Sequence, residues 1–197
     1  VAFVREDIQI LCGYASDEVK SRLFTQLSER VKVALKDTSI AGVRQQILLL
    51  HLFAAVIPYA TPSEVPGALE FLQSQTREKH VAAVQRRFLY CKLQLIGYHA
   101  KMLEENGTLL PTFTACESDL LSTSVDVRKY HVKALDYLVN AMSSSKAENM
   151  ETLIQTMPRL VLCVKDVNNK IRSITFALLI DVAEAMKRAD CEIKQPD

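Results

Sequence analysis

Residues Pro158–Met186 read PRLVLCVKDVNNKIRSITFALLIDVAEAM. This stretch contains the end of one predicted helix, a tight turn over Asp166–Asn169 and a second predicted helix. Apolar side chains recur in the second helix with the 3.6-residue period of a helix that buries one face: Ile171, Ile174, Leu178, Val182, Ala185 and Met186. A turn aspartate followed by an apolar residue and an arginine is typical of helical repeats, so further copies of this unit would predict the whole fold.

Arginines recur through the chain at intervals close to the length of this unit. The spacings are 39, 42, 42 and 44 residues, from Arg5 through Arg44, Arg86 and Arg128 to Arg172. The register at Arg86 is uncertain by one residue, because Gln85 precedes it and Arg87 fits as well. A period near 42 with two helices per unit lies in the range of roughly 40 to 47 residues found for HEAT and armadillo repeats.

We therefore predict an all-α fold, an α-solenoid of HEAT-like or armadillo-like helical hairpins that stack because no unit buries its apolar face alone. Residues 1–15 are predicted to be the second helix of a truncated repeat, residues 16–188 four repeats, and residues 189–197 a polar tail. The connections between helices are predicted at Ser16-Asp17, Asp37-Thr-Ser, Pro58–Pro66, Asn106-Gly107, Ser122-Thr-Ser and Ser143-Ser-Ser. Pro158 is predicted to kink a helix over 147–164. The main alternative is a closed all-helical bundle.

The composition favours helix. Hydrophobic residues make up 49% of 197 residues and glycine and proline are few, which disfavours disorder and an all-β fold. The net charge of +1 gives no global attraction to nucleic acid. The longest uncharged apolar run, Ile47 to Ile57, is too short for a membrane span and predicts a buried helix.

The residues that carry chemistry are scattered. Five cysteines without paired spacing argue against a disulfide framework and favour a reducing compartment. The four histidines do not fall at metal-ligand spacing, and His51 and His131 are predicted to be buried. No catalytic triad context, glycine-rich phosphate loop or paired carboxylate in a cleft-like setting is visible. We therefore expect no enzyme activity, catalytic residue, metal or cofactor, no small-molecule substrate and no membrane partner.

The recurring arginines have two interpretations. They could form a basic ladder that binds phosphates or an acidic partner, or each could bond a turn aspartate or a carbonyl of its own or the adjacent repeat. We favour the second, structural interpretation for Arg44, Arg128 and Arg172, with Asp166 as the turn residue of the same pattern.

A second basic group is the better candidate for contacts with a partner or RNA. It comprises Arg86, Arg87, Lys92, Lys129 and Lys133. Nearby aromatic residues would suit RNA, although aromatic residues at helical spacing are more often core. Acidic neighbours dilute the charge of this group, so a solvated face is the competing interpretation.

Residues 158–179 resemble the ribosomal-RNA-processing protein twelve family, large HEAT-repeat factors of small-ribosomal-subunit assembly. The family pattern reads Pro-Glu-x-Ile-Leu-Cys-x-Lys-Glu, then Lys-x-Arg and Ala-Phe-x-Leu-Leu. The residues that carry the resemblance are Pro158, Val161, Leu162, Cys163, Lys165, Asp166, Val167, Lys170, Arg172, Phe176, Ala177, Leu178 and Leu179. The chain departs from the pattern at Arg159, Asp166 and Thr175.

This resemblance implies a non-enzymatic scaffold of pre-ribosomes in the nucleolus and nucleus, with shuttling to the cytoplasm also allowed. Its expected partners are assembly factors within a large complex, and contacts with pre-ribosomal RNA are a further expectation. The family supplies no catalytic residues to carry over. The alternatives are another HEAT-repeat protein-binding module, such as a karyopherin-type receptor or a tubulin-binding module, and a helical enzyme or regulatory domain.

Overall fold

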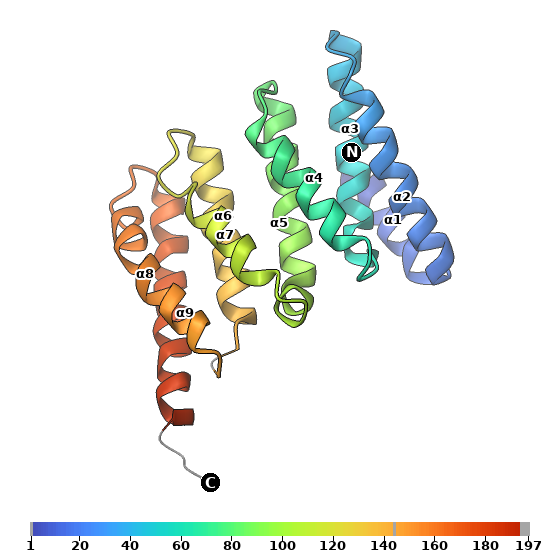
Figure 1. The fold of residues 1–197 in the computed structure, drawn as a ribbon. Helices are drawn as coiled ribbons and strands as arrows, with labels where there is room; N and C mark the ends of the chain where they lie inside the picture. The colour runs from blue at the N-terminus through green and yellow to red at the C-terminus, as the bar shows by residue number, and fades with distance from the viewer. Residues whose placement is uncertain (1, 144, 194–197) are drawn as a thin grey trace. The chain divides into compact units, whose positions relative to one another are not determined.

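The computed structural model describes residues 2–143 and 145–193, with the side chains of residues 6–143 and 145–189. This part of the chain is all-helical and contains no strand (Figure 1), which confirms the predicted fold class at that level. Its helices are α1 (Ala2–Tyr14), α2 (Asp17–Ala34), α3 (Ile40–Val56), the 3-10 helix η1 (Ile57–Tyr59), α4 (Val65–Arg77), α5 (Ala82–Glu105), α6 (Leu109–Glu117), α7 (Val125–Ala141), α8 (Ala147–Cys163) and α9 (Asn169–Ile193).

The chain divides into two compact units. Unit 1 comprises Val1–Tyr98 and unit 2 comprises His99–Asp197, so the boundary falls within α5. The two units are described separately below.

Helices of unit 1 begin at the polar turns that the sequence predicts. The Ser16 hydroxyl accepts a hydrogen bond from the Val19 amide, and the Ser39 hydroxyl accepts one from the Gly42 amide. Such N-caps satisfy amides that have no partner inside the helix. The carboxylate of Asp37 accepts a bond from the Ser39 amide at 2.9 Å, which closes the turn between α2 and α3.

Gly42 is needed where α3 begins. A Cβ atom at this position would lie 2.4 Å from both the side chain and the carbonyl oxygen of Asp37. The first turn of α3 therefore packs directly onto the preceding turn, and no larger residue fits without displacing the backbone. Gly107 has a different role, because its φ of 69° ends α5 in a conformation that glycine adopts readily.

The core of unit 1 lies along α3. Helices α1 and α2 pack against α3, and the rings of Phe24 and Phe53 are 5.1 Å apart. The segment Ile40–Tyr59 is long and apolar enough to cross a membrane by length and composition alone, yet 56% of it is buried inside the structure. This agrees with the buried helix predicted around Ile47 to Ile57.

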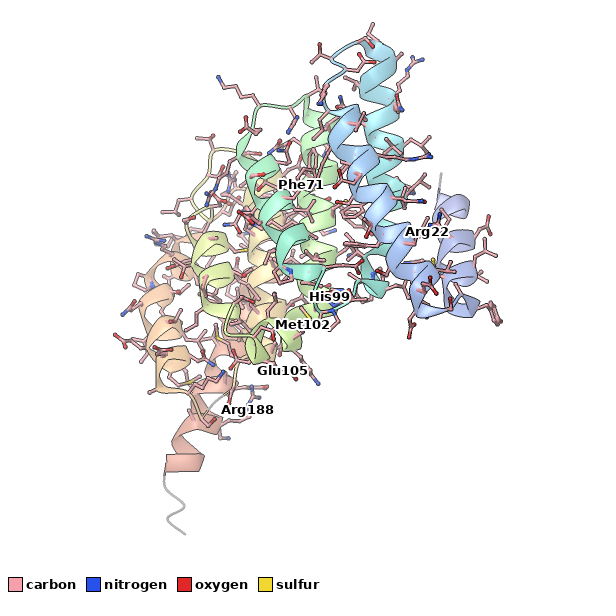
Figure 2. The ribbon with its side chains drawn as sticks, turned by 45° about the vertical axis from the view of Figure 1, so that its right-hand side comes forward. Arg22, Phe71, His99, Met102, Glu105 and Arg188 are labelled. Atoms are coloured by element: carbon pink, nitrogen blue, oxygen red, sulfur yellow. The ribbon has the colours of Figure 1, made fainter. Side chains whose placement is uncertain are left out.

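Glu64 fastens the start of α4 to α2. Its carboxylate accepts hydrogen bonds from the hydroxyls of Ser21 and Thr25 and from the amide and hydroxyl of Thr61. Burial alone would raise the pKa of Glu64, but these hydrogen bonds outweigh it and the pKa is lowered. Phe71 projects from α4 (Figure 2) and its ring meets that of Phe88 of α5 edge-on at 6.1 Å.

Unit 2 contains two helical hairpins, α6–α7 and α8–α9. Helix α7 packs against α9, and α6 packs against α8. The Cys163 thiol donates to the Leu120 carbonyl at 3.8 Å, so backbone and side chains join the two hairpins. The described thiols of Cys12, Cys91, Cys116 and Cys163 are all buried, and none of these four forms a disulfide.

Two predicted helix bounds differ from the structure. Helix α9 continues to Ile193, so residues 189–193 are helical and only residues 194–197 of the predicted tail lie outside the described part. Helix α6 ends at Glu117, before the predicted connection at Ser122-Thr-Ser. Pro158 lies inside α8, as predicted. Pro158 and Ile154 are both exposed, so water can reach the Ile154 carbonyl that Pro158 cannot bond.

Candidate functional site

Arg128 joins the two hairpins of unit 2 through a bidentate ion pair. Its Nε lies 2.6 Å from one carboxylate oxygen of Asp166, and its Nη2 lies 3.2 Å from the other. The two side chains are only 13% and 7% exposed. The hydrogen bond from Arg128 is the largest cause of the lowered pKa of Asp166, and the same bond raises the pKa of the guanidinium. This geometry fixes the turn between α8 and α9 against the first turn of α7.

Arg128 and Arg172 make the same contacts with their own turns. Nη1 of Arg128 donates to the carbonyls six and five residues earlier, at 2.7 and 3.1 Å. Nη1 of Arg172 donates to the carbonyls of Asp166 and Val167, also six and five residues earlier and at the same distances. Each arginine thus closes the turn before its helix, as the structural interpretation expects. Arg172 differs in its remaining bond, in which Nη2 donates to Oδ1 of Asn169.

Arg44 does not follow this pattern, so its predicted structural role is wrong. Its side chain is exposed, and no hydrogen bond or ion pair links it to another described side chain or carbonyl. Gln46 closes the turn in its place, because its Nε2 donates to the carbonyls of Ala34 and Asp37. Gln85 repeats one of these bonds, to the carbonyl nine residues earlier. Unit 1 therefore uses buried or half-buried glutamines where unit 2 uses arginines. The side chain of Arg5 lies outside the described part.

The predicted basic group is divided between the two units. In unit 1, Arg86 is exposed and Arg87 is half-buried, whereas Lys92 is only 2% exposed. Assigning Lys92 to a contact surface was wrong, because a side chain that is only 2% exposed cannot reach a partner. In a helix with apolar residues on several faces, periodicity alone could not place this lysine.

Lys129 and Lys133 form the part of the basic group that belongs to unit 2. Lys129 lies 3.3 Å from the Asp126 carboxylate and 4.9 Å from the centre of the Tyr130 ring. Lys133 is exposed and lies 6.0 Å from the centre of the Tyr137 ring. Two lysines thus lie along α7, and each is close to a tyrosine of the same helix. Tyr130 is one residue from Lys129, and Tyr137 is one helical turn from Lys133.

Sequence reasoning missed a carboxylate pair formed by Asp136 of α7 and Asp181 of α9. Burial, a hydrogen bond with Asp181 and repulsion by its charge together raise the pKa of Asp136 to about 6, while Lys133 opposes the shift. Asn140 donates to Asp181 at 3.1 Å. The two aspartates lie 45 positions apart in the sequence, so only the packing of α7 on α9 reveals the pair.

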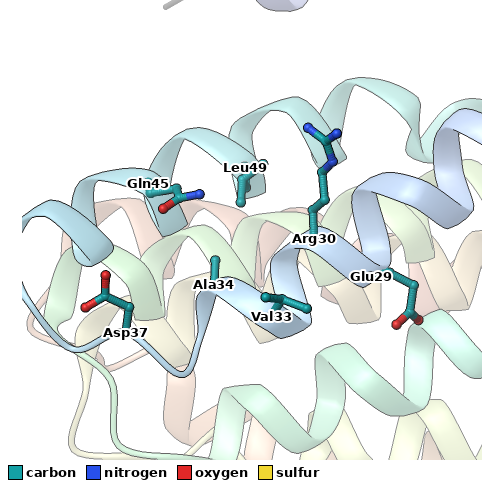
Figure 3. Close-up of a pocket in the computed structure, with 7 residues that line it drawn as sticks. All are labelled: Glu29, Arg30, Val33, Ala34, Asp37, Gln45 and Leu49. Atoms are coloured by element: carbon teal, nitrogen blue, oxygen red, sulfur yellow. The ribbon is translucent and has the colours of Figure 1, made fainter.

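A shallow groove of about 450 Å³ runs between α2 and α3 of unit 1 (Figure 3). The residues that line it are Glu29, Arg30, Val33, Ala34, Asp37, Gln45 and Leu49. Three of the seven lining residues are apolar, and the other four are polar or charged.

The described histidines are explained by packing. His51 and His131 are 8% and 2% exposed, as predicted, and Nδ1 of His131 lies 3.5 Å from the Asp119 carboxylate. Burial lowers the pKa of His80, whose ring lies 5.0 Å from that of Phe88. Within the described side chains, no group of three or more histidine, cysteine or carboxylate residues is placed to hold a metal ion.

No family model and no curated protein matches the chain. Among solved structures, the chain is similar to an engineered protein whose crystal structure was determined by the Northeast Structural Genomics Consortium. The two are 14% identical, and the match covers 94% of this chain and 85% of the other with a TM-score of 0.54. At this identity the similarity shows a shared all-helical fold and nothing about function.

Proposed function

We propose that the chain is an α-solenoid of HEAT-like hairpins that acts as a non-enzymatic scaffold. In this proposal it binds assembly factors, and pre-ribosomal RNA, during biogenesis of the small ribosomal subunit in the nucleolus and nucleus. Residues 158–179, which resemble the ribosomal-RNA-processing protein twelve family, support the biological setting. The geometry of unit 2 supports the architecture.

The observation that carries the solenoid proposal is the repeated contact of Arg128 and Arg172. The same guanidinium nitrogen closes the preceding turn in two successive hairpins, with equal offsets and equal distances. A repeat of this kind is expected when each hairpin is one copy of a structural unit. A closed bundle, the competing fold, has no reason to repeat a bond at a 44-residue interval.

The surface of α7 supports the expectation of RNA contact. Lys129 and Lys133 place two charges along one helix, and each has a tyrosine ring nearby. Lysines bind phosphates as point charges, and aromatic rings stack on unpaired bases. The Asp126 carboxylate beside Lys129 weakens this surface, so Lys133 is its stronger member.

Affinity purification of the tagged chain from nucleolar extract tests the scaffold role. Recovery of small-subunit precursors and their assembly factors is the expected result. Recovery of Ran-GTP with transport cargo, or of tubulin, would instead identify a different class of HEAT-repeat binder. A variant with Leu135→Ala, which truncates a fully buried side chain of α7, serves as a destabilised control.

A salt titration of single-stranded RNA binding tests the surface of α7. We expect the logarithm of the binding constant to fall linearly with the logarithm of salt concentration, and Lys133→Gln to reduce the slope by about 0.7. The matched control is Lys32→Gln, an exposed lysine of α2 that also lies over an aromatic ring. A flat salt dependence would contradict phosphate binding by this surface.

A further inference from the structure

Helix α9 carries a largely exposed stripe that corresponds, residue for residue, to a stripe of α7 that contacts the α8–α9 hairpin. On α7 the stripe is Arg128, Val132, Asp136 and Asn140. Arg128 bonds Asp166, Val132 is 0% exposed, and Asp136 and Asn140 contact Asp181. The contacts of Arg128, Asp136 and Asn140 are all made with the α8–α9 hairpin, and α9 packs against α7.

The corresponding stripe of α9, 44 residues later, is Arg172, Phe176, Ile180 and Glu184. Phe176 is 54% exposed where Val132 is fully buried, and Ile180 is 60% exposed. Large apolar side chains grouped in this way mark a surface that another element covers.

Arg172 adds a polar anchor to this apolar face. Nη1 holds the guanidinium in the pose that Arg128 has, against the carbonyls of its own turn. In Arg128, Nε and Nη2 then grip the Asp166 carboxylate. Among the described residues, no ion pair includes Arg172 and no hydrogen bond uses its Nε.

We propose that the α9 face formed by Arg172, Phe176 and Ile180 is a docking site for a helical hairpin that carries an aspartate in its turn. The aspartate binds Nε and Nη2 of Arg172, as Asp166 binds Arg128, and the apolar side of the hairpin covers Phe176 and Ile180. The docked hairpin packs on α9 in the way that the α8–α9 hairpin packs on α7. The inference rests on the repeat geometry of the proposed solenoid and does not depend on a ribosomal role.

An extended chain tests the site directly. Residues 1–185 are followed by a second copy of residues 142–193, so that the copied hairpin meets α9 in the register in which α8–α9 meets α7. The amides of the copied helices are expected to resist hydrogen exchange, and those of residues 172–185 to exchange about tenfold more slowly than in the original chain. Exchange of the copied hairpin at the rate of an unfolded peptide would overturn the proposal.

Two substitutions test the anchor within the extended chain. Arg172→Gln and Asp166→Asn in the copied turn alone are each expected to lower the urea midpoint, and the double variant is expected to lower it no further than the worse single variant. Additive effects would show that the two residues do not interact. Arg172→Gln in the original chain measures the stability that is lost with the bonds of Arg172 to its own turn. None of these measurements involves RNA or ribosomal particles.

The original chain tests the competing occupant, a second copy of itself. Sedimentation is expected to show a monomer for the original chain and for Phe176→Ser, which changes an exposed residue and leaves the fold intact. Self-association that Phe176→Ser abolishes would assign the face to a second copy and overturn the proposal.

Discussion

At the residue scale, the Arg128–Asp166 pair joins two successive hairpins through side chains that are 38 residues apart in the chain. Both side chains are largely withdrawn from water, and each satisfies the charge of the other. The removal of one partner leaves a buried charge without compensation, which costs more than the loss of a surface pair. Two predictions belong to this scale.

Asp166→Asn and Arg128→Gln should each lower the free energy of unfolding by about 3 kcal/mol, because each leaves the opposite charge buried and unpaired. Chemical denaturation followed by circular dichroism measures the change. Arg128→Lys should cost nearly as much, since an ammonium group cannot reproduce the bidentate contact. The control is Glu29→Gln, which breaks an exposed pair with Lys32 and should change the stability by about 0.5 kcal/mol or less.

Asp136 should make unit 2 less stable as the pH rises. Its pKa is about 6 in the folded chain against an ordinary value of 3.8, so the folded chain binds a proton that the unfolded chain has released. The stabilisation is therefore complete below pH 3.8 and is lost as the pH rises through about 6. Asp136→Asn should remove this dependence and raise the stability at pH 7 by about 2 kcal/mol. Denaturation curves at pH 5 and pH 7 measure the free energy of unfolding of the original chain and of Asp136→Asn. The same change between the two pH values in both proteins would contradict this prediction.

At the element scale, helices begin where short polar residues supply caps. The α2–α3 turn shows how tightly such a connection can pack, because the first turn of α3 touches Asp37 at Gly42. Gly67, in the first turn of α4, has no atom within 4 Å of an added Cβ. The two glycines therefore differ in what they contribute to the same kind of element.

Gly42→Ala should destabilise the protein by about 1 to 3 kcal/mol, because its methyl group overlaps the Asp37 backbone. Gly67→Ala should instead stabilise it by about 0.5 to 1 kcal/mol, because alanine restricts the unfolded chain and favours helix. Thermal unfolding of the two variants in parallel measures both changes. Equal effects at both positions would show that the contact with Asp37 does not constrain α3.

At the scale of the whole molecule, two compact units follow one another along the chain. In the proposed solenoid, each hairpin is stabilised by its own core and by its neighbours. A local defect should then loosen the hairpins beside it and leave distant ones protected. A closed bundle would lose protection everywhere at once.

Leu135→Ala tests this difference, because Leu135 is fully buried in α7. The substitution should cost about 2 to 5 kcal/mol. Hydrogen exchange read by mass spectrometry should show faster exchange across α6 to α9, with α2 and α3 nearly unchanged. Equal acceleration across both units would contradict the solenoid and favour a single cooperative bundle.

Much of the fold follows from short-range patterns in the sequence. Apolar periodicity, the Ser16, Ser39 and Ser124 caps and the turn at Gly107 depend on residues within one helical turn of each other. The contacts of Arg128 and Arg172 with their own turns are equally local, so the structural interpretation could anticipate them. Pro158 lies inside α8, as the pattern predicts.

The sequence by itself therefore determined that the described part of the chain is all-helical, where most helices begin, and that Arg128 and Arg172 close their turns, because these properties depend on neighbours along the chain. Only the tertiary structure decided that Lys92 is enclosed, that Gln46 replaces Arg44, that Asp136 meets Asp181, and that Arg128 holds a carboxylate while Arg172 does not. Most of these outcomes depend on which faces pack together between helices that lie about 40 residues apart in the sequence. Helical periodicity identifies an apolar face, but it cannot say which partner covers that face.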